Sequence, residues 1–476
     1  MELDPAICDR ARLARDARFD GRFYIAVRTT GIYCRPVCPA VSPRRVNILY
    51  YPTAAAAAEA GYRPCLRCRP EAAPGTPAWE GTSATVRRAL RLIGEGALDT
   101  GSVEALAAKV GVGPRHLHRL FVEHLGASPV GVAQTRRLHF AKRLLDETQL
   151  PMGQVAAASG YGSVRRFNAS FLQTYGRAPS QLRRSRQRAS AEPDTYCLRL
   201  AYRPPYDWEG LLAFLARRAL PGVETVDAGV YRRTIRVGGR GGWFQVRHLP
   251  EAGSLELTVR HPDATVLYEV TARVRQQFDL GLDPAVVRDA LGADPLLAPA
   301  LARRPGLRIP GAFDLFELLV RAVLGQQVSV AAARTHAGRL ASAYGEPCPG
   351  PGGLTHLFPT PEALAQVSPA SLPLPRARGE ALVQLAQAVA RGALALDAPA
   401  EELQVRLERL PGIGPWTAAY ALLRGLGEPD AFPEGDLVLR RVAGGASPLT
   451  ARALRERAER WRPWRGYAAL LLWSLA

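Results

Sequence analysis

The chain has 476 residues, and its 62 lysine and arginine residues against 43 aspartate and glutamate residues give a formal net charge of +19. Hydrophobic residues make up 47% of the chain, which excludes a mostly disordered or collagen-like protein. At roughly 100–200 residues per domain, we expect about three domains. The longest apolar run, from Tyr467 to Leu475, is about half of the ~20 residues that a membrane span needs.

The basic charge is almost entirely arginine. Only Lys109 and Lys142 are lysine, which leaves 60 arginines. Arginine-rich codon bias can account for much of this excess of arginine over lysine. The charge therefore favours an anionic partner only in general terms, and nucleic acid is a better candidate than a membrane surface. The N-terminus carries Glu2, Asp4 and Asp9 and lacks the basic-then-apolar pattern of a signal peptide. We therefore expect a cytoplasmic, nucleoid-associated protein.

Two stretches are typical of linkers. Residues 69–84 are rich in proline, glycine and small residues, and residues 183–195 are basic and polar. They separate a cysteine-bearing N-terminal region, a middle region of about 100 residues and a long C-terminal region. The last region begins with mixed strand-like and helical segments, and from Asp314 its pattern is almost wholly helical.

Two closely spaced cysteine pairs mark the N-terminal region. Cys34 and Cys38 are followed by Cys65 and Cys68, which is typical of a tetrahedral four-thiolate zinc site. Purely structural zinc is one interpretation. A reactive site is the other, because the cluster would carry a net charge of about −2 and its thiolates are nucleophilic toward an alkyl group. A zinc hydrolase is disfavoured, since four cysteine ligands leave no open position for water.

The stretch FYIAVRTTGIYCRPVCPA, followed by GYRPCLRCRP, resembles the N-terminal domain of the Ada family of bacterial adaptive-response regulators. The resemblance implies a small α/β zinc domain over residues 1–70, in which Cys34 irreversibly takes a methyl group from a DNA methylphosphotriester and the other three cysteines stay ligands. Thr30 and Arg63 occupy positions that the family uses near the DNA. Methylation would change the cluster charge from about −2 to about −1 and so strengthen operator binding.

An internal repeat with a period of 50 residues fills the middle region. Each copy is predicted to be a helix-turn-helix, with helices over 103–109 and 114–124 in the first copy and over 152–158 and 163–175 in the second. The matching apolar positions, Leu117 and Phe121 in one copy and Phe167 and Phe171 in the other, together with Leu120, are interpreted as core.

The second helix of each copy carries the residues expected to contact DNA. These are Arg115, His116 and Arg119 in the first copy and Arg165, Arg166 and Asn168 in the second. They suit phosphate contacts and base-edge hydrogen bonds in a major groove; a pair of solvated helical hairpins with a basic tail is the alternative. The repeat resembles the paired helix-turn-helix domain of the AraC family, which implies a DNA-binding domain over residues 83–185.

A glycine-rich turn is the most informative motif of the C-terminal region. The stretch LPGIGPW, containing Gly412 and Gly414, is predicted to turn between two helices and to offer backbone N–H groups to a DNA phosphate. An ordinary helix–helix turn is the alternative. Asp436 lies 22 residues after Gly414, and this hairpin-plus-aspartate spacing resembles the helix-hairpin-helix superfamily of DNA glycosylases.

Further motifs resemble the AlkA family of alkyl-base glycosylases. They are PPYDW at 204–208, FLARR at 214–218, RPGLRIPG at 304–311, RAVLGQQVS at 321–329 and AERWRPWRGY at 458–467. The resemblance implies an α/β subdomain over 196–305 and an all-α helix-hairpin-helix glycosylase domain over 306–476. The expected fold class is therefore multi-domain, mainly α with α+β parts.

The residue types suit the excision of an alkylated purine. Asp436 is the expected stabiliser of an oxocarbenium-like sugar and a candidate general base for water, with Glu434 and Asp430 as competitors. An N-alkylated purine is cationic, so aromatic faces would attract it by about 1 kcal/mol each. The expected pocket rings are Trp416, Tyr420, Trp473 and Phe214, with packing in the core as the alternative for each.

Residues 143–476 contain no lysine. A bifunctional glycosylase-lyase of this superfamily forms a Schiff base through a lysine beside the hairpin, where this chain has Trp416. Monofunctional hydrolysis without strand cleavage is therefore predicted. Gln327 stands where AlkA relatives have an apolar wedge that fills the gap left by the flipped base. The energetics of an apolar wedge therefore cannot be applied to this chain.

These features predict a fused alkylation-response protein: a zinc methyl-acceptor sensor, a double helix-turn-helix regulator and a DNA-3-methyladenine-type glycosylase. We expect one Zn²⁺, no organic cofactor, double-stranded DNA as the partner, a contact with RNA polymerase, no membrane and a monomeric state. The alternative is a DNA-binding regulator whose zinc is structural and whose glycosylase-like half only grips DNA.

Overall fold

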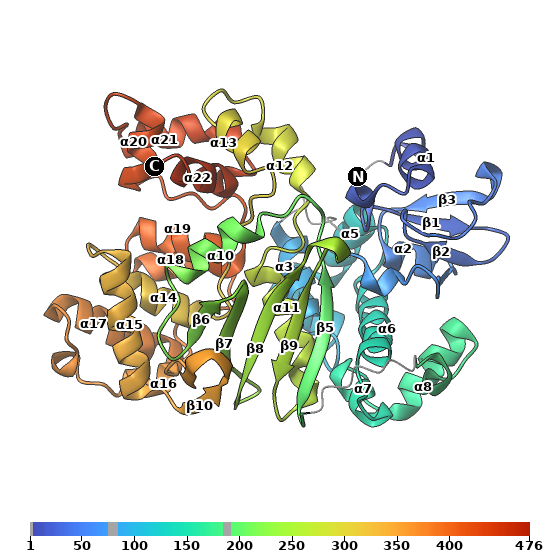
Figure 1. Ribbon diagram of the computed structural model, residues 1–476, viewed down its shortest axis with the longest axis horizontal. Coiled ribbons are helices and arrows are strands. Elements are labelled where there is room, and N and C mark those ends of the chain that lie inside the picture. Colours follow the sequence, from blue (N-terminus) through green and yellow to red (C-terminus); the bar gives the residue numbers. More distant parts are fainter. Residues whose placement is uncertain (1–2, 75–83, 184–191) are drawn as a thin grey trace. The chain divides into compact units, whose positions relative to one another are not determined.

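The computed structural model describes residues 3–74, 84–183 and 192–476 (Figure 1). The chain forms two compact units. The first comprises residues 1–204, 249–272 and 280–282, and the second comprises residues 205–248, 273–279 and 283–476. Among the described residues, no helix has both the length and the apolar character needed to cross a membrane.

A four-stranded sheet organises the N-terminal part of the first unit. Its order is β3-β1-β2-β4, with bounds Ile48–Tyr51, Tyr24–Val27, Ile32–Cys34 and Arg63–Pro64. Strand β1 is antiparallel to both of its neighbours, whereas β2 and β4 are parallel, with Tyr33 opposite Pro64. Because parallel strands end at the same edge of a sheet, Cys34 and Cys65 emerge side by side.

A helix covers each face of this sheet, and successive side chains of β1 point toward one helix and then the other. The helices are α1 (Pro5–Leu13) and α2 (Ala54–Glu59). Ile25 belongs to the core that contains Cys8 of α1, and the preceding Tyr24 belongs to the core that contains Ala57 of α2. Successive side chains of a strand face opposite sides. Thr53 begins α2 as its N-cap, since Thr53 Oγ1 accepts from the Ala56 amide at 3.0 Å.

The internal repeat forms two helix-turn-helix units. Their helices are α4 (Val103–Lys109) and α5 (Pro114–Leu125), then α7 (Met152–Ala158) and α8 (Val164–Tyr175). Leu117, Phe121, Phe167 and Phe171 are completely buried, which confirms the core predicted from the repeat, while Leu120 is half-buried. Both second helices end at a left-handed glycine, the usual helix terminator.

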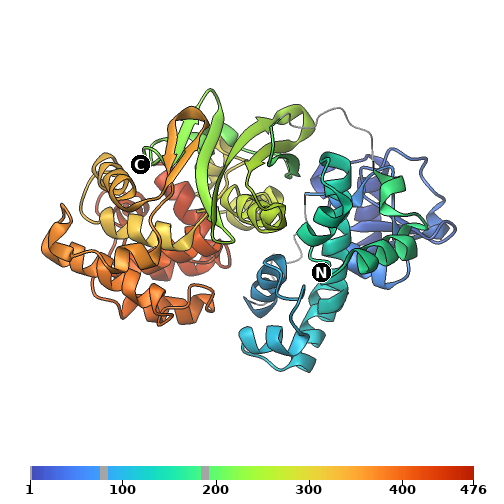
Figure 2. The ribbon, with the colours of Figure 1, turned by 90° about the horizontal axis from the view of Figure 1, so that it is seen from below.

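Helix α6 (Pro129–Glu147) joins the two helix-turn-helix units and also packs on the cysteine-bearing part (Figure 2). The Tyr33 hydroxyl on β2 is hydrogen-bonded to His139 Nε2 at 2.8 Å. The guanidinium of Arg69 lies 3.0 Å from an Asp146 carboxylate oxygen and 3.3 Å from one of Glu147. The first unit is therefore one packed body, in which α6 is shared by the cysteine domain and the DNA-binding repeat.

The His139 contact predicts an acid-sensitive first unit. Burial, with a further contribution from Arg143, lowers the pKa of His139 to about 4, so the unfolded chain binds a proton that the folded protein excludes between pH 6.5 and 4. As the pH falls through this window, the free energy of unfolding should drop by up to about 3 kcal/mol. Urea unfolding of wild type and His139→Gln at several pH values tests this, because zinc release and carboxylate titration act on both proteins alike. An equal pH dependence in the two would contradict it.

Two further helices and two strands lie in the described part of the first unit. Helix α3 spans Ala84–Gly94 and α9 spans Pro179–Leu182. Strands β5 (Thr195–Ala201) and β9 (Ser254–Arg260) pair antiparallel without a register shift over their full length. The first predicted linker ends where α3 begins, and its central residues lie outside the described part of the chain, as do those of the second predicted linker.

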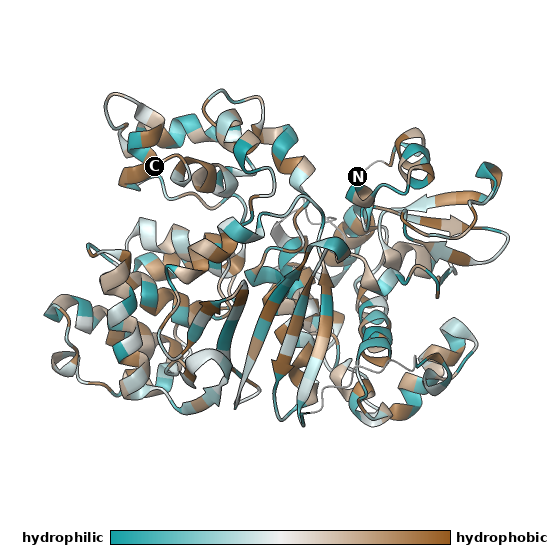
Figure 3. Cartoon of the chain, in the orientation of Figure 1, coloured by the Kyte–Doolittle hydropathy of each residue, from teal (hydrophilic) through white to brown (hydrophobic). Residues whose placement is uncertain are grey.

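The second unit combines an antiparallel meander with many helices. The meander consists of β6 (Glu224–Asp227), β7 (Val230–Val237) and β8 (Arg240–Leu249), and hydrophobic and hydrophilic bands alternate along its strands (Figure 3). The helices outside the hairpin include α10 (Trp208–Ala216), α11 (Leu267–Gln277, shared with the first unit), α12 (Pro284–Leu291), α13 (Ala298–Arg303), α14 (Leu315–Leu324), α15 (Val330–Tyr344), α16 (Pro361–Ala365), α17 (Arg376–Ala390), α20 (Leu437–Gly444), α21 (Ala451–Ala458) and α22 (Arg465–Trp473). A ribbon of β10 (Pro347–Gly350) and β11 (Leu354–His356) interrupts the region predicted to be almost wholly helical.

The glycine-rich turn lies between two helices, as predicted. Helix α18 (Ala400–Glu408) precedes it and α19 (Pro415–Ala421) follows it. Ile413 within the turn belongs to the same buried cluster as Leu319 of α14, Leu382 of α17 and Leu403 of α18. This core holds the turn in place, while Gly412 and Gly414 stay exposed.

Candidate functional site

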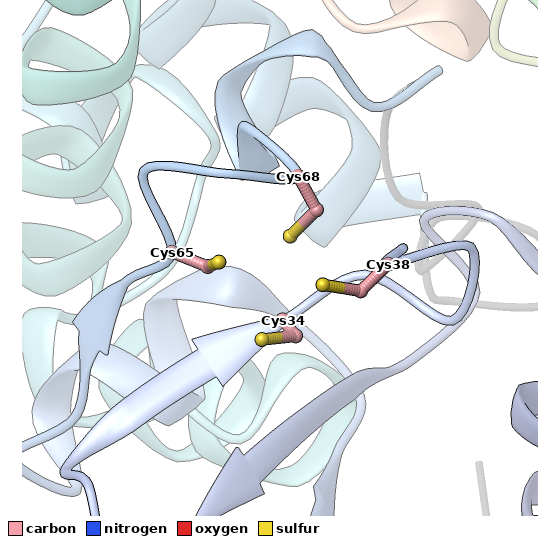
Figure 4. Close-up of side chains that lie close together, drawn as sticks. All are labelled: Cys34, Cys38, Cys65 and Cys68. Atoms are coloured by element: carbon pink, nitrogen blue, oxygen red, sulfur yellow. The ribbon is translucent and has the colours of Figure 1, made fainter. Parts of the chain in front are cut away.

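The four cysteines of the N-terminal region meet at one point. The Sγ atoms of Cys34, Cys38, Cys65 and Cys68 all lie within 4.8 Å of one another, and the side chains converge on a common centre (Figure 4). Four sulfurs bound tetrahedrally to zinc at about 2.3 Å would be about 3.8 Å apart. The donor set and its spacing therefore fit one Zn²⁺.

The electrostatics of the cluster also favour a cation. The hydrogen bond with Cys34 lowers the pKa of Cys38 to about 7, and hydrogen bonds within the cluster lower the pKa of Cys65 as well. The same contacts raise the pKa of Cys34 and Cys68. Four thiols this close compete for negative charge, and a divalent ion removes the competition by binding all four as thiolates.

The two residues predicted to lie near the DNA flank the cysteine strands. Thr30 is exposed in the turn between β1 and β2, and Arg63 is half-buried at the start of β4. The Arg63 amide donates to the carbonyl of Gly31 at 2.8 Å, so both residues lie at the opposite end of β2 and β4 from Cys34 and Cys65. The structure thus brings Thr30 and Arg63 together, one strand length away from the thiolates.

All six predicted contacts of the helix-turn-helix units are exposed. Arg115, His116 and Arg119 lie on α5, and Arg165, Arg166 and Asn168 lie on α8, and all six are exposed whereas Leu117 and Phe167 are buried. In α5 the Arg119 guanidinium is 3.0 Å from His116 Nδ1. The two helices therefore present similar polar surfaces, as two reading helices in a duplex require.

Asp436 is held by three N–H donors in the second unit. It is the N-cap of α20 (Leu437–Gly444), and its Oδ1 accepts from the Leu439 amide at 3.0 Å. The indole N–H groups of Trp416 and Trp473 donate to Oδ2 at 2.8 Å and to Oδ1 at 3.2 Å. A carboxylate offers about four lone-pair positions, so one is left for a substrate or water.

The two competing carboxylates are occupied by arginines. Asp430 pairs with Arg462 and Arg465, and Glu434 pairs with Arg455. No described arginine or lysine forms an ion pair with Asp436, whose neighbours are neutral donors. The Asp436 carboxylate is half-exposed, and no described ion pair within the protein neutralises its charge.

The pocket rings have partners that the sequence did not reveal. Trp416 stacks on Tyr420 with centroids 5.1 Å apart and ring planes 11° apart. The guanidiniums of Arg218 and Arg424 lie 3.7 Å and 4.8 Å from the Phe214 centroid. The Phe214 ring thus already has two cations of the protein beside it. A base that stacks on Trp416 has to use the ring face turned away from Tyr420.

Arg424 contacts two of the rings predicted for the pocket, Tyr420 and Phe214, from an irregular turn. It lies in a π-helical turn, Leu422–Leu426, that follows α19, and its guanidinium donates to the Tyr420 hydroxyl at 2.6 Å. Although burial alone would raise the pKa of Tyr420, the charges of Arg424 and Arg218 lower it. Such π turns are frequent at functional sites, but the sequence carries no signal for this one.

Comparison with known proteins agrees with these sites. Four family models match: "Metal binding domain of Ada" over residues 7–71, "Helix-turn-helix domain" over 106–185, "AlkA N-terminal domain" over 197–314, and "HhH-GPD superfamily base excision DNA repair protein" over 320–465. A probable bifunctional transcriptional activator/DNA repair enzyme AlkA of Mycobacterium tuberculosis is 45% identical over 482 residues, covering 100% of this chain and 97% of that protein. The chain belongs to the bifunctional AlkA family. The resemblances to Ada and to AlkA are confirmed.

Other relatives each match one part of the chain. The DNA-3-methyladenine glycosylase 2 of Escherichia coli is 40% identical and covers 58% of the chain and 95% of that enzyme. Ada of Escherichia coli is 44% identical over 28% of the chain and 35% of Ada. The solved 3-methyladenine DNA-glycosylase of Archaeoglobus fulgidus superposes with a TM-score of 0.52 at 25% identity, over 58% of the chain and 96% of that structure. The zinc, helix-turn-helix and glycosylase parts thus each match a family model.

Proposed function

We propose that the C-terminal half of this protein excises alkylated purines from double-stranded DNA, and that the N-terminal half detects alkylation by accepting a methyl group. The observation that carries the first assignment is Asp436, aimed by three neutral N–H donors beside the hairpin. The convergence of four cysteine sulfurs carries the second.

Asp436 would stabilise the developing sugar cation. As the N-glycosidic bond breaks, positive charge grows on the sugar, and a fixed carboxylate at that point lowers the barrier most where water is excluded. The bonds from Trp416, Trp473 and Leu439 hold the carboxylate in place before the reaction, so no reorganisation is needed. The remaining lone-pair position would orient the attacking water.

The aromatic pocket would select the extruded base. A flipped purine would stack on the free face of Trp416, backed by Tyr420, and the polarised ring faces favour a base made cationic by alkylation. Trp473 would border the same space through its contact with Asp436. Phe214 would act as a wall that Arg218 and Arg424 hold in place.

Hydrolysis without strand cleavage is the expected outcome. No lysine exists between residues 143 and 476 to form a Schiff base, and Trp416 stands beside the hairpin. Borohydride added to the protein on DNA with an abasic site should trap no covalent adduct, and no strand break should appear, while a glycosylase-lyase run in parallel gives both. A trapped adduct would contradict the monofunctional mechanism.

The sensor reaction would occur at Cys34. Its sulfur would form a bond to the methyl carbon of a DNA methylphosphotriester while the carbon–oxygen bond breaks, and the phosphate oxygen would keep the electron pair as a diester anion. Zn²⁺ held by the four cysteines keeps their sulfurs deprotonated at neutral pH. Thr30 and Arg63, brought together beside β2, would contact the DNA backbone.

The helix-turn-helix units would convert this reaction into operator binding. A methylated Cys34 is a neutral thioether, so the cluster repels DNA phosphates less. The exposed residues of α5 and α8 would then contact bases and phosphates, and Gly412 and Gly414 would bind a phosphate at the glycosylase hairpin.

The proposed domains are residues 1–70, 83–185, 196–305 and 306–476. We further propose a cytoplasmic, nucleoid-associated monomer whose helix-turn-helix part contacts RNA polymerase at the promoter. The competing proposal is a regulator with structural zinc and a glycosylase-like half that only binds DNA. The neutral N–H donors around Asp436 favour the enzyme, because a carboxylate used only for folding needs no such orientation.

A base-release assay decides between the two. Purified protein is incubated with DNA treated with a methylating agent, and free bases are separated by chromatography. Release of 3-methyladenine at a rate proportional to protein supports the glycosylase. DNA binding without any release supports the regulator that only binds.

A further inference from the structure

The turn between α14 and α15 carries two adjacent glutamines with different surroundings. Gln327 is exposed and has a left-handed backbone, with φ of 56°. This conformation is uncommon for a residue with a side chain. Gln326 is half-buried and points back into the protein. The turn therefore presents Gln327 outward and uses Gln326 for an internal contact.

Gln326 joins this turn to the glycosylase hairpin. Its side-chain amide donates to the carbonyl of Gly412 at 2.7 Å and lies 3.3 Å from the hydroxyl of Thr417, the third residue of α19. Its backbone carbonyl accepts from the Arg378 guanidinium of α17 at 2.7 Å. Gln326 thus connects the turn to which it belongs with both the hairpin and α17.

The hairpin side of this junction has little room to shift. Gly412 has φ of 79°, and a Cβ at this position would be 2.6 Å from the Cβ of Ala381 on α17. The hairpin backbone therefore lies directly against α17. Since Gln326 binds both the hairpin and α17, the distance from the hairpin to Gln327 is fixed by contacts on both sides.

Base extrusion needs the correct distance between the hairpin and Gln327. In the proposed reaction the hairpin holds a phosphate while the side chain of Gln327 enters the space left by the base. If the distance between the hairpin and Gln327 were wrong, the protein could make only one of these two contacts at a time. A misplacement of about 1 Å can cost about a hundredfold in rate. We propose that Gln326 is a positioning residue for base extrusion, which sets the wedge turn against the phosphate-binding hairpin. The inference rests on the proposed glycosylase function.

The amide contact is separable from folding. Packing of α14 against its neighbours comes from a large buried cluster that includes Leu319, Val323 and Leu382, whereas the bond from Gln326 to Gly412 lies at the exposed edge. Loss of a bond at such an edge costs about 1 kcal/mol of stability, so a variant should fold. Gln326→Glu keeps the size of the side chain but replaces the N–H donors by a negative charge beside the Gly412 carbonyl, and Gln326→Ala removes the donors without adding a charge.

The test compares two DNA duplexes under single-turnover conditions. One has an alkylated purine paired normally, and the other has the same purine opposite an abasic site, where extrusion costs little. Gln326→Glu and Gln326→Ala should slow release from the paired duplex by about tenfold or more and from the unpaired duplex by less than about threefold. Gln387→Ala is the matched control, because the Gln387 amide also donates to a backbone carbonyl, that of Ala365, away from both turns.

Three outcomes are informative. Selective loss on the paired duplex, absent from Gln387→Ala, supports the inference. Equal loss on both duplexes, or none on either, overturns it while leaving the proposed function intact. If wild type releases no base from either duplex, the proposed function itself fails, and the inference fails with it.

Discussion

Replacement of Asp436 by Asn should lower the single-turnover rate of 3-methyladenine release by about a hundredfold to a thousandfold. Asn is also a good N-cap, so α20 should still begin at this residue. The substitution removes the negative charge that opposes the sugar cation, while the arginines and the hairpin stay in place. Affinity for methylated DNA, measured by fluorescence anisotropy, should therefore change by less than about threefold.

Glu434→Gln is the matched control for this experiment. Glu434 is a carboxylate two positions away whose charge is already paired with Arg455, so its loss should change the rate by less than about threefold. If Glu434→Gln removed activity and Asp436→Asn did not, the assignment of the reactive carboxylate would be wrong. Equal activity of wild type and Asp436→Asn would favour the protein that only binds DNA.

Incubation with DNA that carries methylphosphotriesters should add one methyl group to the protein, at Cys34. Among the four clustered cysteines the resemblance to Ada singles out this one as the acceptor. The product should bind its operator about tenfold more tightly, because one negative charge beside the phosphates is lost. Peptide mass spectrometry locates the methyl group, and a gel-shift titration at fixed salt measures the affinity.

Two variants sharpen this result. Cys34→Ser should take up no methyl group, and Cys197→Ser, which changes a thiol of the same unit outside the cluster, should behave as wild type. A methyl group found on Cys38, Cys65 or Cys68 would move the reactive position. An unmodified protein after long incubation would leave the zinc with a structural role only.

Sequence spacing was sufficient to predict the local geometry of motifs that lie on short stretches of chain. The two cysteine pairs, the repeat of 50 residues and the glycine-rich turn each specify local geometry through ligand chemistry, helix period or backbone freedom. The N-cap position of Asp436 could also have been found, since an aspartate directly before an apolar run is an N-cap signal, but the predicted role of Asp436 came from the resemblance to the glycosylases. The fold class followed from these motifs, except for the β10–β11 ribbon, whose strands of four and three residues leave no clear alternating pattern.

The contacts across long sequence separations could not be predicted. Arg424 and Phe214 are brought together by packing between α10 and the turn after α19, and nothing in either sequence stretch indicates the other. The same is true of Gln326 and Gly412, which are 86 residues apart. A side-chain pattern reports which face is buried, but the partner on that face is set by the tertiary fold.

Helix α6 has a consequence for how such a regulator can be divided or transferred. One of its faces belongs to the cysteine domain: His139 meets Tyr33, and Asp146 and Glu147 meet Arg69. A fragment that begins after residue 84 would expose the half-buried His139 and remove Arg69 from both carboxylates, so that Asp146 would keep only its ion pair with Lys142. An attempt to graft this DNA reader onto a different signal input would therefore have to take the methyl-accepting domain with it or redesign one side of a single helix.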